Sequence, residues 1–202
     1  MSQGLVFVIC APSGTGKTTL AGRLLAEFPQ LNFSVSCTTR PPRPGEVDGE
    51  DYFFISKQEF EAKRADNEFL EWAEVHGNYY GTLRKTVEEA LSKGKDLLFD
   101  IDVQGAAQVR LNLPGHCVFA FIAPPSILAL RHRLEARGSE CPEIICRRIA
   151  NAKAEVANAH WFDFLVVNDE LELAYRELKS AYLAARLSPT RQAGLINKLL
   201  AE

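Results

Sequence analysis

The feature that most constrains this chain is the stretch A-P-S-G-T-G-K-T, residues 11–18, which directly follows the apolar run L-V-F-V-I-C. A short, wholly apolar run is typical of a central parallel strand that is covered on both faces. A glycine-rich turn between such a strand and a helix points several backbone N–H groups at one place, where the helix dipole favours an anion. The stretch therefore predicts a phosphate-binding loop that opens a helix at about residues 18–28.

The loop departs at one position from the nucleotide-binding pattern G-x-x-x-x-G-K-[S/T], because Ala11 stands where the first glycine is expected. That position mainly starts the turn, so a methyl group is a small obstacle if φ stays negative. We expect Lys17 to reach the β- and γ-phosphates and the Thr18 hydroxyl to ligate Mg²⁺. The alternative is a structural turn that merely contains G-K-T. The residues predicted to bind the nucleotide are Ala11, Pro12, Ser13, Gly14, Thr15, Gly16, Lys17, Thr18 and Thr19.

Apolar runs and helical patterns alternate along much of the remaining chain. Residues 96–102, 117–123 and 164–168 are predicted strands, and helices are expected at 103–111, from about 126, and at about 171–186. Strands alternating with helices indicate an α/β fold, in which helices cover both faces of a parallel central sheet.

Three stretches depart from this alternation. Residues 36–93 are more polar and aromatic, and they predict an inserted α+β subdomain. An arginine-rich segment at 131–148 is broken by Gly138 and Pro142, which indicates two helices joined by a mobile turn. The tail after residue 187 carries leucines and an isoleucine at helical spacing, and we expect it to pack against the body or a partner.

Composition excludes several classes of protein. A chain of 202 residues is long enough for one compact domain, and its formal net charge of -3 lacks the basic excess that nucleic-acid and membrane-surface binders need. No apolar run approaches the roughly 20 residues that span a bilayer. Its five cysteines form no C-x-x-C pair, which favours reduced thiols in a cytoplasmic protein.

A second phosphate site is suggested by the stretch T-T-R-P-P-R-P-G-E-V. Arg40 and Arg43 lie on this proline-stiffened segment, where fixed guanidinium groups suit a phosphate, and Ser36 and Tyr52 add hydroxyl groups nearby. The same residues also fit a polyproline ligand of an SH3-type domain. From these residues alone, both interpretations remain open.

Longer motifs distinguish between the two. The stretches S-V-S-C-T-T-R-P-P-R-P-G-E-V-D-G-E-D-Y, E-F-L-E-W-A-E-V-H-G-N-Y-Y-G-T, D-I-D-V-Q-G, I-A-P-P-S, R-L-E-A-R-G and V-N-D follow the phosphate loop in order. With that loop, they make the chain resemble bacterial members of the guanylate kinase family from about residue 4 to 182. Alanine at the first loop position also occurs in that family.

The resemblance implies roles for individual residues. It implies that the phosphate of GMP is held by Ser36, Arg40, Arg43, Tyr52 and Tyr80, and that guanine is read by Glu71, Thr82 and Asp102. It places the catalytic cations at Lys17, Arg133, Arg137 and Arg148, and it places Asn168 near the adenine of ATP. Asp100 either orients the Mg²⁺ shell through water or touches the substrate GMP. Helix capping is the alternative role for Asp100 and Asp102, and an exposed basic helix face is the alternative for the arginines.

The implied activity is Mg²⁺-dependent transfer of the γ-phosphoryl group of ATP to GMP or dGMP in purine nucleotide metabolism. One P-loop domain of three layers is expected, with a core at about 1–35, 94–125 and 160–186, a GMP-binding insert at 36–93, a helical lid at 126–159 and a tail at 187–202. The alternatives are a non-catalytic guanylate kinase-like interaction module and a kinase for another nucleoside monophosphate. The tail is a candidate surface for homo-oligomerisation.

Overall fold

The computed structural model describes residues 4–75, 77–136, 138, 141–189 and 191–201, and within them the strands form two sheets. The strands of the central sheet are β1 (Val6–Cys10), β2 (Leu31–Phe33), β7 (Asp96–Asp100), β8 (Cys117–Ala123) and β9 (Phe164–Val167). They are all parallel and lie in the order β2-β7-β1-β8-β9. The second sheet contains β3 (Ser36–Thr38), β4 (Tyr52–Phe54), β5 (Phe69–Val75) and β6 (Asn78–Leu83), in the order β4-β3-β6-β5.

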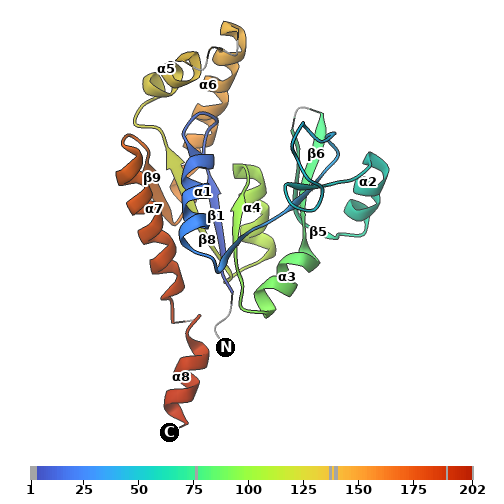
Figure 1. The fold of residues 1–202 in the computed structure, drawn as a ribbon, viewed down its shortest axis with the longest axis vertical. Helices are drawn as coiled ribbons and strands as arrows, with labels where there is room; N and C mark the ends of the chain where they lie inside the picture. Colours follow the sequence, from blue (N-terminus) through green and yellow to red (C-terminus); the bar gives the residue numbers. More distant parts are fainter. Residues whose placement is uncertain (1–3, 76, 137, 139–140, 190, 202) are drawn as a thin grey trace.

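Helices connect and cover these strands (Figure 1). They are α1 (Lys17–Glu27), α2 (Lys57–Ala65), α3 (Arg84–Ser92), α4 (Val103–Asn112), α5 (Ile127–Ala136), α6 (Pro142–Ala157), α7 (Leu171–Arg186) and α8 (Ala193–Leu200), with a 3-10 turn at Ala159–Trp161. The predicted α/β fold with a parallel central sheet is confirmed. Two predicted strands are shorter than expected. The strand β7 ends at Asp100, because Asp102 already serves as the N-cap of α4, and β9 ends at Val167.

The central strand β1 contributes to two hydrophobic cores, because successive side chains of a strand point to opposite faces of the sheet. Phe7 and Ile9 are fully buried in the core that α1 and α7 cover. Val6 and Val8 are fully buried in the core that α3 and α4 cover. Burial on both faces explains the unbroken apolar run in the sequence and produces the three layers of the domain.

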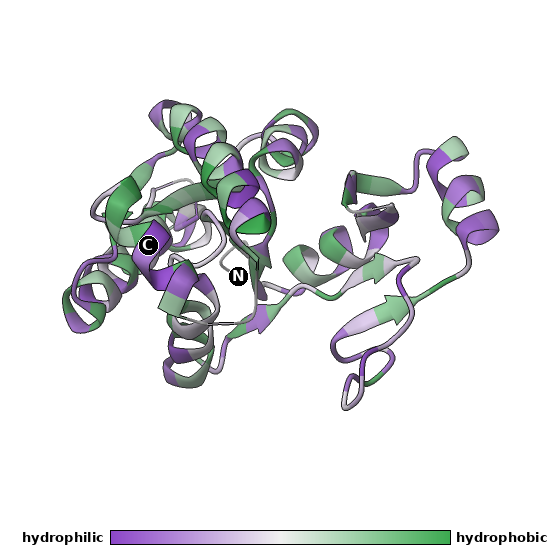
Figure 2. Cartoon of the chain, turned by 90° about the horizontal axis from the view of Figure 1, so that it is seen from above, coloured by the Kyte–Doolittle hydropathy of each residue, from purple (hydrophilic) through white to green (hydrophobic). Residues whose placement is uncertain are grey.

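The second sheet lies within residues 36–93, here called the insert, and to one side of the central sheet (Figures 1 and 2). Its small core contains Phe60 and Phe69, whose rings stack with centroids 4.3 Å apart. The helix α2 begins at its N-cap Ser56, whose hydroxyl accepts a hydrogen bond from the Glu59 N–H. This cap stabilises the start of a helix whose opposite face is exposed.

The helices α5 and α6 form a pair at the end of the central sheet where its strands terminate (Figure 1). Leu130 and Leu134 of α5 pack against Ile145 and Ile149 of α6 in a separate hydrophobic cluster. The two predicted helices of the arginine-rich segment are thus present. Their packing places the helix pair above the glycine-rich loop that follows β1.

The other end of the sheet is held by buried polar groups. The Asp96 carboxylate accepts hydrogen bonds from the Leu5 N–H at 3.0 Å and from the Tyr182 hydroxyl at 2.7 Å. The Arg191 guanidinium, only 7% exposed, donates to the carbonyl oxygens of Gly4 and His116, each at 2.9 Å. These contacts anchor the chain just before α8, which itself projects away from the body (Figure 1).

Within the described ranges, none of the helices combines the length and the apolar character that a membrane span requires.

Candidate active site

The loop between β1 and α1 has the backbone geometry of an anion-binding turn. Gly14 and Gly16 have φ values of 92° and 94°, in the left-handed region that favours glycine. Among the described residues other than glycine, only Asn67 has a positive φ, so the φ of Ala11 is negative. The alanine at the first position of the motif therefore causes no backbone strain. Gly16 is the N-cap of α1 and provides no capping side chain, so the N–H groups at the helix start face a potential ligand.

Lys17, the first residue of α1, is held at the edge of the central sheet. Its ammonium group forms an ion pair with the carboxylate of Asp100, at the end of the neighbouring strand β7. The side chains are 21% and 22% exposed, so the pair remains open to solvent on one side. A cation and an anion are thus placed together at the carboxyl ends of the strands, where open α/β sheets bind their ligands.

A cavity of about 960 Å³ extends from the loop to the inner face of α6. Residues 11–14 and 16–19 of the loop and α1 line one wall. Asp100, the last residue of β7, and Asp102, the N-cap of α4, also line the cavity. The facing wall is formed by α6, and Glu74 and Val75 of the insert complete it. The cavity is large enough for a nucleotide triphosphate group and its surroundings.

The predicted lid arginines separate into two groups. Arg148 lines the cavity and donates to the Ser13 hydroxyl at 2.6 Å, and its neighbour Arg147 also lines the cavity. Arg133 lies on α5 and donates instead to the carbonyl oxygens of Asn168 and Asp169, at 2.8 and 3.4 Å. Arg137 lies outside the described residues. The structure therefore brings Arg148 to the phosphate loop and connects Arg133 to the turn after β9.

Sequence reasoning missed the polar residues on the inner face of α6. Asn151 and Glu155 of α6 and its C-cap Asn158 line the cavity together with Arg147 and Arg148. Burial raises the pKa of the Glu155 carboxyl to about 6, against the opposing influence of the Lys17 charge. Their spacing of three and four residues could have indicated that they lie together, since such positions share one face of a helix.

Polar side chains of the insert form a second part of the site. Glu71 of β5 is 4% exposed, and its carboxylate accepts a hydrogen bond from the Thr82 hydroxyl at 2.6 Å. The Ser36 hydroxyl lies 3.0 Å from that of Thr82, so three neighbouring strands contribute to one polar chain. A Cβ atom at Gly105 would lie 2.7 Å from Glu71 Oε2, so glycine at this position leaves room for the carboxylate.

The Glu71 carboxyl group is buried, and none of the cations in the described part of the chain pairs with it. Burial raises the pKa of Glu71 to about 7, the Asp102 charge adds to the rise, and the Thr82 hydrogen bond opposes it. Asp102 itself caps α4, with its carboxylate accepting from the Gly105 N–H at 2.8 Å. Asp102 also lines the cavity, so its capping contact leaves it beside the ligand space. Buried carboxyl groups with raised pKa values occur preferentially at functional sites.

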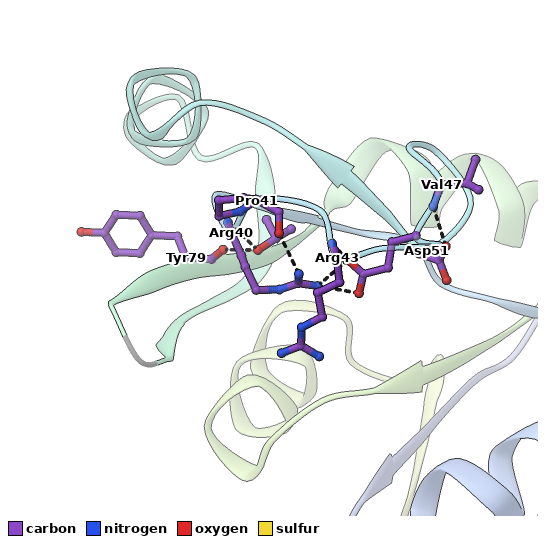
Figure 3. A network of polar contacts seen from close by, with 8 residues as sticks. Arg40, Pro41, Arg43, Val47, Asp51 and Tyr79 are labelled. Atoms are coloured by element: carbon purple, nitrogen blue, oxygen red, sulfur yellow. Dashed lines mark hydrogen bonds and ion pairs between the residues drawn. The ribbon is translucent and has the colours of Figure 1, made fainter.

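Arg40 and Arg43, two of the predicted phosphate residues, lie in one network of polar contacts of the insert (Figure 3). The Arg40 guanidinium donates to both oxygens of the Glu46 carboxylate, at 2.8 and 3.0 Å, and lies over the Tyr52 ring at 5.5 Å. The Arg43 backbone N–H donates to the same carboxylate at 2.7 Å. Glu46 was not among the predicted residues, although it belongs to the same motif.

The two tyrosines of β6 face opposite sides of the small sheet. Tyr79 stacks on Phe60 with ring centroids 5.1 Å apart, so it belongs to the core of the insert. Tyr80 packs edge-on against Tyr52, with centroids 5.9 Å apart. Burial raises the pKa of the Tyr52 hydroxyl, and smaller contributions come from Tyr80 and Asp100. Asp100 thus pairs with the loop lysine and also contributes to the raised pKa of Tyr52 in the insert.

The oxygen donors of the cavity fit a magnesium ion that is bound together with a nucleotide. Thr18 and Asp100 line the cavity, but the described residues form no cluster of three or more histidine, cysteine or acidic side chains that could hold a metal. Mg²⁺ usually keeps several waters and is held by one or two protein oxygens together with substrate phosphates. A hydroxyl and a carboxylate beside a phosphate loop provide that kind of site.

Comparisons with known proteins agree with this geometry. The family model described as guanylate kinase matches residues 3–185. Guanylate kinase of Oleidesulfovibrio alaskensis is 54% identical over 198 residues, which cover 98% of this chain and 96% of that protein. Guanylate kinase of Lawsonia intracellularis is 50% identical over 199 residues, covering 98% and 93%.

A solved structure extends the agreement to the fold. The crystal structure of guanylate kinase from Anaplasma phagocytophilum aligns with a TM-score of 0.79 and 32% identity, covering 100% of this chain and 96% of that one. Sequence and structure thus match over essentially the whole length. The chain therefore belongs to the guanylate kinase family, and it is an enzyme of the nucleoside monophosphate kinase class with a P-loop kinase fold.

Proposed function

We propose that the protein transfers the γ-phosphoryl group of ATP to GMP, and more slowly to dGMP, giving ADP and the corresponding diphosphate. The observation that carries this proposal is the buried Glu71 carboxylate, which Thr82 holds in place beside Asp102. Guanine has two adjacent donors, N1–H and the 2-amino group, that pair with a carboxylate. Adenine has no N1–H, so AMP would leave the buried charge unpaired, and such sites reject the wrong ligand by about 10⁴-fold.

The phosphoryl donor is assigned to the loop after β1. The backbone N–H groups of the loop and Lys17 bind the β- and γ-phosphates, whose charges compete with Asp100 for the lysine. Thr18 would hold Mg²⁺ directly and Asp100 would hold it through water. When bound, the metal neutralises charge that develops on the phosphates during transfer.

The acceptor phosphate is assigned to the insert. Its binding residues are Ser36, Arg40, Arg43, Tyr52 and Tyr80, which orient the phosphate of GMP towards the donor. No general base is needed, because the second pKa of a phosphate monoester is about 6 and GMP already carries an anionic nucleophile near neutral pH. We assign Arg133, Arg137 and Arg148 to the lid, where their guanidinium groups stabilise the transferred phosphoryl group.

We propose that the domain consists of a core, an insert at about residues 36–93 and a lid at about residues 126–159. The insert and the helix pair α5 and α6 lie on different sides of the phosphate loop (Figure 1). Closure of both over the loop brings donor and acceptor together and excludes water from the reaction.

Acceptor specificity tests this proposal. We expect fast ADP release from Mg²⁺-ATP with GMP, weaker release with dGMP, and negligible release with AMP, CMP or UMP. Turnover with AMP would retain the kinase but contradict the roles of Glu71 and Asp102. A folded sample that binds ATP but uses none of these acceptors would favour a non-catalytic interaction module.

We also propose that α8 mediates self-association. Its apolar residues Leu195, Ile196, Leu199 and Leu200 are 53%, 41%, 61% and 81% exposed, although their sequence spacing suggested packing. Truncation after Gln192 keeps the buried contacts of Arg191 and removes this surface. In sedimentation velocity, the full chain is expected to sediment as an oligomer and the truncated chain as a monomer. Identical association states for the two proteins would contradict the proposal.

A further inference from the structure

Asn168 directly follows β9 and its side chain contacts the phosphate loop. The residue is 6% exposed, and its backbone N–H donates to the Ala123 carbonyl oxygen at 2.8 Å, which fixes it to the central sheet. Its side-chain Nδ2 donates to the Thr15 carbonyl oxygen at 2.6 Å. A Cβ atom on Gly16 would lie only 2.5 Å from the same nitrogen, so the amide packs directly against the Thr15–Gly16 peptide.

This contact determines the orientation of one peptide group of the loop. In a planar trans peptide, the carbonyl oxygen and the following N–H point in opposite directions. Because Asn168 holds the Thr15 carbonyl on the protein side, the Gly16 N–H is turned towards the opposite side. Gly16 lines the cavity, whereas Thr15 is 1% exposed and does not line it. The Gly16 N–H is therefore directed to the place where an anion would bind.

Two other hydrogen bonds support this arrangement. The Thr15 hydroxyl donates to the Pro12 carbonyl oxygen at 2.6 Å, which closes the loop on its other side. Arg133 donates to the Asn168 carbonyl oxygen at 2.8 Å, so α5 holds the turn that carries the asparagine. Asn168 is thus fixed by the sheet, by α5 and by the loop.

We infer that Asn168 is a positioning residue for the phosphoryl donor, acting on the phosphates through the Thr15–Gly16 peptide rather than by contact with the adenine. This inference rests on the proposed use of ATP. Its chemical target is the polyphosphate group, so the nature of the attached base should be irrelevant to the effect of the side chain.

Binding measurements with and without a base test the inference. Calorimetric affinities would be measured for inorganic tripolyphosphate, ATP and GMP with the Asn168→Ala variant. We expect tripolyphosphate and ATP to weaken by the same factor, about tenfold for one lost hydrogen bond, while GMP affinity is unchanged. A fall in ATP affinity with unchanged tripolyphosphate affinity would make Asn168 an adenine contact and overturn the inference. Unchanged affinity for both ligands would overturn it as well.

Two further variants keep the test decisive. Asn168→Asp has the same shape but lacks the donor, and its affinity for tripolyphosphate should recover towards low pH, where the protonated carboxyl again donates. If the affinity does not recover relative to the wild type, the inference is contradicted. This test remains available even if Asn168→Ala does not fold. Asn32→Ala is the matched control, because Asn32 Nδ2 also donates to backbone carbonyl groups, at 3.0 and 3.3 Å, but outside the cavity.

The control variant should bind all three ligands as the wild type does. Because tripolyphosphate binding does not depend on GMP, a wild-type protein that fails to phosphorylate GMP would refute the proposed function while leaving the role of Asn168 testable by the same titrations.

Discussion

Replacement of Glu71 by glutamine is expected to lower kcat/KM for GMP by about 10³-fold or more while the affinity for ATP stays unchanged. The amide retains one acceptor oxygen but places an NH₂ group where guanine presents a second donor. The exposed Glu61→Gln in the same insert is the matched control and should behave as the wild type. Unaltered GMP kinetics in Glu71→Gln would refute the assignment of this carboxyl to base recognition.

The same substitution should stabilise the free protein at high pH. Since the pKa of Glu71 is raised from 4.5 to about 7 by folding, the folded state binds this proton more tightly than the unfolded state. The stabilising contribution is fully present below the unfolded pKa and is lost as pH rises through the folded value. Above pH 7 this difference amounts to at most about 3 kcal/mol, and glutamine, which does not titrate, avoids the loss.

Urea unfolding at pH 5 and pH 8 measures this effect. The difference in unfolding free energy, variant minus wild type, should be larger at pH 8 than at pH 5. An equal difference at both pH values would show that Glu71 is not the titrating group. Together with the kinetic result, a more stable but inactive variant would identify a buried charge that is retained for ligand recognition.

Replacement of Lys17 by alanine is expected to reduce GMP phosphorylation by about 10³-fold, because cationic groups that stabilise phosphoryl transfer typically contribute 10³-fold or more. The substitution also leaves the Asp100 carboxylate without its ion-pair partner, so repulsion of the triphosphate adds to the loss. Steady-state ADP release and direct ATP titration would separate the effect on turnover from the effect on binding.

The control for this variant is Lys85→Ala, which removes an exposed lysine from α3. Its turnover and ATP affinity should match those of the wild type. Retention of near wild-type turnover by Lys17→Ala would mean that the loop does not bind the transferred phosphate and would contradict the proposed mechanism.

Much of the fold followed from sequence patterns because the central strands are buried on both faces. The apolar runs at β1, β7, β8 and β9 fit buried strands better than other elements. The glycines before Lys17 and Thr18 mark the turn between the first strand and the first helix. The more polar and aromatic composition of residues 36–93 set them apart in the sequence, and β3, β4, β5 and β6 form a sheet of their own there. Its strand pairing depends on contacts distant in sequence, which no local pattern specifies.

Site residues were harder to predict where several residues of the same type lie close together in the sequence. The arginines of the lid look alike in sequence, but only the packing of α5 against α6 decides that Arg148 faces Ser13 and Arg133 faces Asn168. Asn151 and Glu155 were missed because the exposed and lining faces of α6 are both polar. Glu46 was missed because its role is to hold Arg40, a contact that spacing alone does not show.

The position of β1 at the centre of the sheet has a consequence for synthesis on the ribosome. Its neighbours β7 and β8 pair Val6 with Leu97 and Cys117, so both lie far along the chain. At about 5–20 residues per second, the roughly 90 residues that separate β1 from its first neighbour take about 5–20 s to be made. For that time an apolar strand and the phosphate loop attached to it have no partner in the sheet. The nascent chain is therefore most prone to aggregation before its second half emerges.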